Sequence, residues 1–183
     1  HEVLKDEALA AEAASLKKEI HDAIESMAIV DNYYYGKVYA YEVDGYGQYM
    51  LMDDANVPSL LAMDYLGYEA EDRQVVENTR NFVLSCANPY YYEGSCAKGV
   101  GSQHTKPGYI WHIALAIQGL TSKTKEEKLA ILNTMKNTDA GKHMMHEGFD
   151  VNDPANYTRE WFSWANAMFC ELVLDYCDIR VAR

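Results

Sequence analysis

The chain has 183 residues, a length that fits one domain or a large part of one. Its 28 acidic residues outnumber 16 lysines and arginines, and the formal net charge of -12 repels phosphate backbones, so we expect no nucleic-acid partner. No apolar run approaches the roughly 20 residues that span a bilayer, and residues 1–20 lack the basic-then-apolar order of a signal peptide. We therefore expect a soluble chain without a membrane partner. Its compartment, cytoplasmic or periplasmic, stays open.

The cysteine and aromatic content narrows the possible chemistry. None of the four cysteines belongs to a C-x-x-C pair, which argues against a zinc knuckle or a thioredoxin-type redox site. Tyrosine supplies 15 residues against 4 Phe and 3 Trp. A tyrosine ring stacks on apolar surfaces while its hydroxyl forms hydrogen bonds, so this composition suits a sugar cleft and also an ordinary core near a wet rim.

Apolar periodicity predicts the elements of the first half of the chain. A long amphipathic helix is expected from Val3 to about Ala28. Residues 37–52 carry β-branched and aromatic side chains around Asp44-Gly45, a pattern that predicts a β-hairpin. Pro58 and Gly67 then fit the start and the end of a short helix.

The second half alternates apolar and amphipathic helices with long loops. A glycine-rich stretch over residues 90–108 is too long for a simple connector and is a candidate functional loop. Thr124 and Glu127 form a capping box, with Ser122 as an alternative cap. Further helices are expected over residues 69–87, 109–120, 121–138 and 159–178.

These elements predict an all-α fold with a short inserted β-hairpin. Helices that are apolar on most sides, paired with amphipathic ones, fit two layers of helices around a cleft. No repeat of fixed period is visible, which disfavours a regular solenoid.

Four segments carry a specific resemblance. In order and spacing they are similar to the C-terminal part of glycoside hydrolase family 125, the exo-acting α-1,6-mannosidases, and the match spans about Tyr39 to Leu174. The segments are DGYGQYMLMDDANVPSLL at 44–61, YYYEGSCAKGVGSQHTKPGYIWHIAL at 90–115, MMHEGFDVNDP at 144–154 and TREWFSWANAMFCELV at 158–173.

The resemblance implies an (α/α)6 toroid of which residues 1–183 form the C-terminal portion of a single catalytic domain. It also implies removal of terminal α-1,6-linked mannose from an α-mannoside oligosaccharide or an N-glycan, with inversion and with no metal or cofactor. Inversion needs one carboxylic acid and one carboxylate base on opposite faces of the sugar. The family's base corresponds to Glu147, in His146-Glu147-Gly148-Phe149. Its acid, and the Arg and Asp that grip the terminal sugar, lie in a part of the family preceding this sequence.

The same resemblance assigns substrate binding to a further set of residues. Asp53 and Asp54 remain possible acids; the resemblance implies that they bind the sugar or order the loop, and helix capping is the alternative. Trp111 and Trp164 fit core packing as well as sugar binding. Trp161 shares that ambiguity. The expected substrate-binding residues are Asp53, Asp54, Asn56, His104, Thr105, Tyr109, Trp111, His146, Trp164 and Asn166.

Other readings compete with the mannosidase. His143, His146 and Glu147 form H-x-x-H-E, which is not the H-E-x-x-H order of zinc peptidases. The chain departs from the family at Gln103 and His112, where proline is usual, and at Gly148, where a small hydroxyl residue follows the base. A non-catalytic carbohydrate-binding module or a structural helical module is therefore the alternative function.

Overall fold

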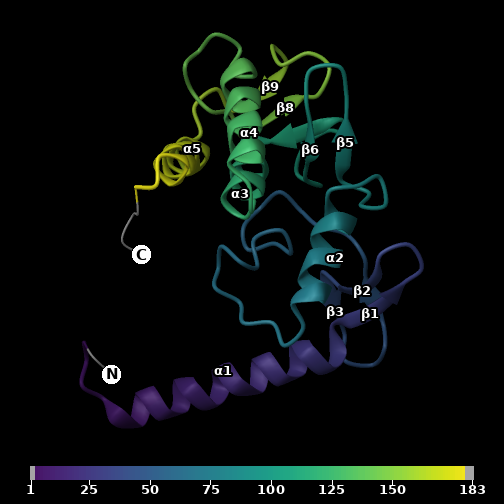
Figure 1. Cartoon of the computed structure of the whole chain (residues 1–183), viewed down its shortest axis with the longest axis vertical. Coiled ribbons are helices and arrows are strands. Elements are labelled where there is room, and N and C mark those ends of the chain that lie inside the picture. The colour runs from purple at the N-terminus through teal and green to yellow at the C-terminus, as the bar shows by residue number, and fades with distance from the viewer. Residues whose placement is uncertain (1–2, 180–183) are drawn as a thin grey trace.

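A computed structural model of the chain describes residues 3–179 (Figure 1). Five helices and nine short strands lie in this range. The helices are α1 Glu7–Met27, α2 Arg73–Val83, α3 His112–Leu120, α4 Lys125–Asn137 and α5 Ser163–Tyr176. The strands are β1 Ile29–Asn32, β2 Gly36–Tyr39, β3 Glu42–Val43, β4 Tyr49–Met50, β5 Tyr91–Glu93, β6 Lys98–Val100, β7 Tyr109–Trp111, β8 Gly148–Asp150 and β9 Tyr157–Thr158.

Side-chain caps define where three of the helices begin. The Asp6 carboxylate accepts a hydrogen bond from the Leu9 amide at 2.9 Å at the start of α1. Asp72 caps α2 in the same way. At α4 the Thr124 hydroxyl accepts from the Glu127 amide at 3.2 Å, which confirms Thr124 as the cap. Caps satisfy amide groups that have no partner inside the helix. Of these three starts, only that of α4 was expected from its cap, whereas the helices expected from Val3 and from residue 69 begin at Glu7 and Arg73.

The strands form four small antiparallel sheets, so the expected all-α fold with one hairpin is only partly confirmed. The predicted hairpin exists as β3–β4, and the Asp44 carboxylate accepts from two amides in its turn. The pairs β1–β2 and β5–β6 are two further hairpins. Strands β7, β8 and β9 form the largest sheet among the described residues, with three strands.

Three expected helical segments adopt other structures. Residues 58–67 form successive turns instead of a helix, and the amides of Leu60 and Leu61 donate to the Asp53 carboxylate. Residues 109–111 pair with β8 as strand β7 before α3 begins. Residues 159–162 precede α5 and are not helical. In the last two segments backbone groups bind partners distant in sequence, namely β8 and the Met145 carbonyl.

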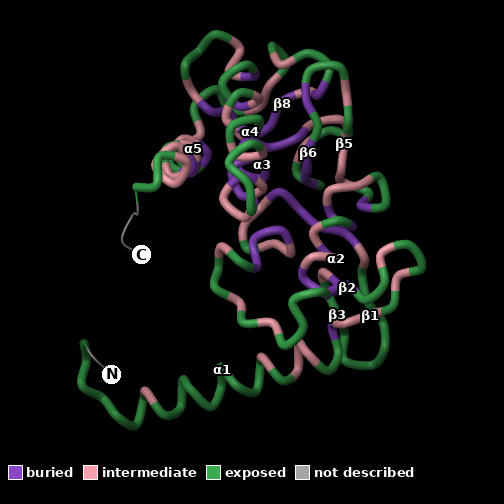
Figure 2. The backbone as a smooth tube through the Cα atoms, in the orientation of Figure 1, coloured by how far each residue is buried: buried purple, intermediate pink, exposed green. Residues whose placement is uncertain are grey.

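The core is built around α3. This helix is buried on nearly all sides and contacts both α4 and α5. Figure 2 shows the buried backbone concentrated around α3, β6 and β8, whereas most of α1 is exposed. No residue of α1 is buried, and Leu9, Leu16 and Ile20 are each about half exposed. None of the described helices is long and apolar enough to cross a membrane.

The contact between α3 and α5 gives a test of this core. A methyl group on Gly119 would stand 2.7 Å from Cδ2 of the fully buried Leu172, so Gly119→Ala overpacks the interface. We expect the variant to lose about 1–3 kcal/mol of unfolding free energy, measured by urea denaturation. Leu172→Ala is the partner variant, and the double variant should lose less than the sum of the two single losses. Additive losses would contradict direct contact.

Candidate functional site

Glu147 lies immediately before β8, in the three-stranded sheet. Its amide donates to the Thr158 carbonyl at 3.2 Å, and the Gly148 amide donates to the Thr158 hydroxyl at 3.1 Å. The Glu147 side chain is 14% exposed, and the Nε of Arg159 donates to its Oε1 at 3.1 Å. The carboxylate is thus held between β8 and the residues that follow β9, with part of its surface open.

Trp111 lies opposite Gly148, the residue that follows Glu147 in the chain. The two residues are paired across β7 and β8. A Cβ on Gly148 would lie 3.0 Å from two atoms of the indole, so the absent side chain leaves room for the ring. The indole Nε1 donates to the Thr105 hydroxyl at 3.0 Å. Gly148 lacks the small hydroxyl side chain that the family is expected to carry at this position. The Thr158 hydroxyl instead accepts a hydrogen bond from the Gly148 amide.

A hydrogen-bond network connects the loop at Asp54 to the glycine-rich loop. Ser102 Oγ donates to Asp54 Oδ2 at 2.9 Å, and the other Asp54 oxygen accepts from the amide and the side chain of Asn56. The His104 amide donates to Ser102 Oγ, and the Thr105 hydroxyl contacts the Ser102 carbonyl. Because Thr105 also accepts from the Trp111 indole, the network connects Asp54, Asn56, His104 and Thr105 to Trp111, whose strand partner Gly148 follows Glu147 in the chain.

Asp53 turns away from this region into the protein. It is fully buried, and its two oxygens accept from the Leu60 and Leu61 amides at 2.8 and 2.9 Å. Burial raises the pKa of Asp53 to about 7, an effect opposed by these backbone hydrogen bonds and assisted by the charge of Asp54. These contacts show that the Asp53 carboxylate orders the loop that contains Leu60 and Leu61.

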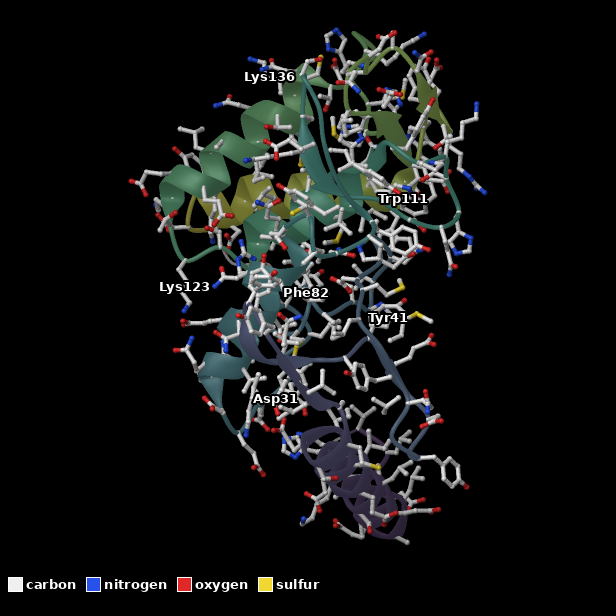
Figure 3. The ribbon with its side chains drawn as sticks, turned by 90° about the vertical axis from the view of Figure 1, so that its right-hand side faces the viewer. Asp31, Tyr41, Phe82, Trp111, Lys123 and Lys136 are labelled. Atoms are coloured by element: carbon white, nitrogen blue, oxygen red, sulfur yellow. The ribbon has the colours of Figure 1, made fainter. Side chains whose placement is uncertain are left out.

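Tyr41 is a neighbour of this loop that the sequence did not single out. Burial raises the pKa of its phenol, and the nearby carboxylates of Asp54 and Asp53 raise it further. Figure 3 shows Tyr41 and Trp111 on the same side of the view. No local pattern marks Tyr41, because its proximity to Asp54 arises only on folding.

Asn166 and His146 both hold the segment that leads into Glu147. The Asn166 amide accepts from the Met145 amide and donates to the Met145 carbonyl, each at 3.1 Å. His146 is fully buried, and its ring nitrogens lie 2.6 and 3.2 Å from the carbonyl oxygens of Glu160 and Asp139. The polar atoms of both side chains are therefore taken up by the backbone, a role that the substrate-binding expectation did not include.

A run of aromatic rings leads from the buried Trp111 to the partly exposed Trp164. The Trp111 and Phe162 rings meet edge to face at 6.3 Å, and Trp164 lies 6.3 Å beyond Phe162. Trp164 is 40% exposed, unlike the buried Trp111. Arg159, whose guanidinium lies 5.8 Å from the centre of the Phe162 ring, is a site residue missed in the sequence although it stands inside the 158–173 segment. Of the remaining candidates, His104 is exposed and Tyr109 is half-buried.

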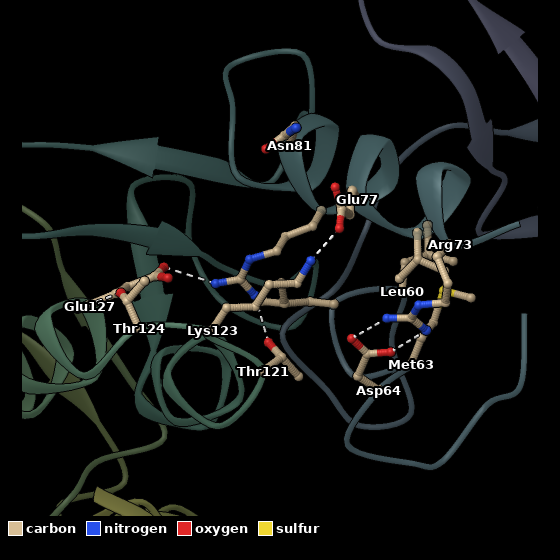
Figure 4. A pocket seen from close by; sticks show the side chains of 13 residues that line it. Leu60, Met63, Asp64, Arg73, Glu77, Asn81, Thr121, Lys123, Thr124 and Glu127 are labelled. Atoms are coloured by element: carbon tan, nitrogen blue, oxygen red, sulfur yellow. Dashed lines mark hydrogen bonds and ion pairs between the residues drawn. The ribbon is translucent and has the colours of Figure 1, made fainter.

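A charged pocket that Glu147 does not line is present elsewhere in the fold. It occupies about 230 Å³ between α2 and the start of α4 (Figure 4). Each of its cations has an acidic partner, with Arg73 on Asp64, Lys123 on Glu77 and Arg80 on Glu127. Paired charges leave little attraction for an anion. Across the described residues, no group of three or more His, Cys, Asp or Glu is arranged to hold a metal ion.

A partly open carboxylate, hydroxyl groups and a run of aromatic rings on a helical scaffold are typical of proteins that bind or cleave carbohydrate. Comparison with known proteins agrees with this class. The sequence pattern of the metal-independent alpha-mannosidases, GH125, matches residues 1–174, and the chain belongs to this family.

Two relatives illustrate the similarity. The chain is 46% identical over 160 residues to the meiotically up-regulated gene 157 protein of Schizosaccharomyces pombe, covering 87% of this chain and 31% of that protein. It is 52% identical to a Streptococcus pneumoniae metal-independent alpha mannosidase solved as a non-productive complex with alpha-1,6-mannobiose. That superposition has a TM-score of 0.92 and covers 98% of this chain and 42% of the solved one. The chain thus spans less than half the length of either relative.

The buried His112 beside the site gives a test by pH. Burial lowers its pKa to about 3, against about 6.5 when unfolded. Between these values the folded chain binds fewer protons than the unfolded chain, so the unfolding free energy should fall as pH drops from about 6.5 towards 3. Urea titrations at several pH values should give a shallower fall for His112→Asn. His143→Asn, at a 93% exposed side chain, is the control and should keep the wild-type slope. If the unfolding free energy of His112→Asn fell with pH as steeply as that of the wild type, the lowered pKa of His112 would be contradicted.

Proposed function

We propose that these 183 residues are the base-bearing part of an inverting exo-α-1,6-mannosidase, with Glu147 as the general base. The observation that carries the proposal is the setting of Glu147. It is a partly open carboxylate oriented by Arg159 beside the Trp111–Phe162–Trp164 rings, in a chain of the α-mannosidase family. The α-1,6 linkage is proposed from the mannobiose in the Streptococcus pneumoniae complex.

The proposed reaction uses two carboxyl groups about 6.5–9.5 Å apart. Glu147 removes a proton from a water molecule as that water attacks the anomeric carbon, and a carboxylic acid protonates the departing oxygen on the opposite face. The anomeric configuration inverts because the attack comes from the side opposite the leaving group. In this chain Arg159 fixes the direction of one Glu147 oxygen, which leaves the other for the water.

We assign the general acid to a carboxyl outside these 183 residues. Asp53 is buried with both oxygens on backbone amides, and Asp54 is 3% exposed with its oxygens on Asn56 and Ser102. Neither carboxyl is free to meet a glycosidic oxygen in this arrangement. Asp54 instead orders the loop whose neighbours, Asn56 and His104, are proposed to contact the sugar.

The sugar itself is proposed to lie against the aromatic rings. The C–H faces of a mannose ring pack well on aromatic faces such as that of the exposed Trp164, while hydroxyl groups of the sugar need polar partners. Thr105, Tyr109 and His104 offer such partners on the glycine-rich loop. The natural substrate is proposed to be an α-mannoside oligosaccharide or the mannose of an N-glycan.

The test is Glu147→Gln in the full-length parent protein. The amide cannot accept the proton of the attacking water, so we expect the turnover of α-1,6-mannobiose to fall by a factor on the order of 10² to 10⁴, while binding of the disaccharide persists. NMR of the first product follows the anomer, which should be inverted in the wild type. Glu93→Gln, a matched change at a side chain 67% exposed, should leave turnover unchanged. Wild-type turnover in Glu147→Gln would refute the base assignment.

The isolated chain gives a second test of the assigned acid. Without that carboxyl, the 183 residues should hydrolyse no α-1,6-mannobiose, because a lone base does not protonate the leaving alkoxide. Cleavage with inversion by the isolated chain would place the acid within it, with Asp53 and Asp54 the first to replace. Binding without cleavage by the full-length parent would favour the carbohydrate-binding alternative.

A further inference from the structure

The arginine that pairs with the proposed base has a largely exposed side chain. Its Nε lies 3.1 Å from Oε1 of Glu147, and the Arg159 side chain is 67% exposed. An exposed arginine has many accessible rotamers, and a single ion pair in water contributes too little free energy to keep the side chain in one of them. A guanidinium that orients a base therefore needs a further restraint.

We infer that Phe162 is a positioning residue that acts on Glu147 through Arg159, and that the left-handed backbone of Arg159 serves the same purpose. The ring restrains the guanidinium from a second side, and the backbone directs the side chain back towards the base. The inference rests on the proposed function for the role of Glu147 as general base.

The backbone of Arg159 changes the direction of the chain directly after β9. Its φ is 45°, in a region that arginine rarely adopts because the Cβ crowds the backbone there. The residues on both sides are held, since Thr158 pairs with Gly148 in the sheet and the Glu160 carbonyl oxygen lies 2.6 Å from Nδ1 of His146. Such a conformation persists where the surrounding contacts determine it, and it is common at functional sites.

The Phe162 ring is fixed by contacts that do not involve the arginine. The Phe162 amide donates to the Met145 carbonyl at 3.2 Å, and the Phe162 carbonyl accepts from the Asn166 side chain at 2.8 Å. The ring also meets the buried Trp111 edge to face, with the centroids 6.3 Å apart. Because Met145 lies two residues before Glu147, these bonds tie the ring to the segment that carries the base.

The guanidinium contacts this fixed ring. The Cζ of Arg159 lies 5.8 Å from the centre of the Phe162 ring. A cation within about 6 Å of an aromatic face is attracted by the ring quadrupole, and a planar guanidinium also stacks on the ring. The arginine side chain is therefore held at two points, by the ring and by the Glu147 carboxylate.

Replacement of Arg159 by glycine in the full-length parent tests the positioning role. Glycine removes the guanidinium and adopts the left-handed conformation without strain. We expect kcat for α-1,6-mannobiose to fall by roughly 10- to 100-fold because the base loses its orientation. The KM should stay nearly unchanged, and thermal unfolding should occur at no lower temperature than in the wild type, because exposed ion pairs contribute little to stability.

Chemical rescue supplies a readout that a structural role would not move. Guanidinium chloride at concentrations below those that denature the protein should restore part of the kcat of Arg159→Gly, whereas KCl at the same concentration should not. Arg73→Ala is the matched control at another exposed arginine–carboxylate pair and should match the wild type with or without guanidinium.

Three results in Arg159→Gly would overturn the inference. An unchanged kcat and KM would show that the arginine has no role in turnover. A raised KM with unchanged kcat would indicate a sugar contact. A lower unfolding temperature without a response to guanidinium would assign the loss of activity to the fold.

A double-variant cycle tests whether Phe162 acts through Arg159. Phe162→Leu keeps an apolar side chain but removes the aromatic face, and we expect kcat to fall about 2- to 5-fold, the equivalent of an exposed cation–π contact. Phe162→Tyr keeps the face and should retain the wild-type kcat. In the Arg159→Gly background, Phe162→Leu should cause no further loss, because no guanidinium is left to restrain. Losses that multiply independently would overturn the inference.

Glu147→Gln in the same parent separates this inference from the proposed function. If that variant kept wild-type turnover, the base assignment itself would fail. If it lost turnover while Arg159→Gly and Phe162→Leu kept theirs, the proposed function would stand and the inference alone would fail.

Discussion

The pairing of β7, β8 and β9 is the constraint on which the site depends. It joins β7 to the distant pair β8–β9 and sets Trp111 opposite Gly148, and Gly148 opposite Thr158. Glu147 precedes the middle strand, so its backbone position follows from the register of the sheet. A shift by one residue would turn every side chain to the other face. The indole beside Gly148 and the Thr158 hydroxyl on its amide both disfavour such a shift.

The buried polar side chains around the site mainly form hydrogen bonds with main-chain groups. Asp53, Asn166 and His146 each bind main-chain groups of another segment, and together they fix the loops that carry Asp54 and Glu147. Every buried side-chain nitrogen or oxygen in the described part of the chain has a hydrogen-bond partner. A buried polar group costs free energy unless it is paired, so these hydrogen bonds to the main chain help to fix the geometry of the loops.

The helix α1 differs from the rest of the fold because its apolar side chains remain largely exposed. Its side chains bury little surface, and a groove of about 530 Å³ runs between it and residues 60–69, lined by Ile20, Ile24 and Leu66. An amphipathic helix gains most of its stability from packing its apolar face. The chain covers 42% of the solved mannosidase, which leaves room in a longer protein for a segment to cover this face.

By itself the sequence determined the elements that depend on neighbours within a few residues. The Thr124 cap and the Asp44-Gly45 turn are local interactions, and the family motifs around Glu147 are contiguous in the sequence. Tertiary structure decided what depends on partners far along the chain. Short strands such as β7 have too few residues for a periodic signal, and their hydrogen bonds go to β8. Likewise, Asn166 and His146 were expected at the sugar, yet their polar atoms bind carbonyl and amide groups that only folding brings within reach.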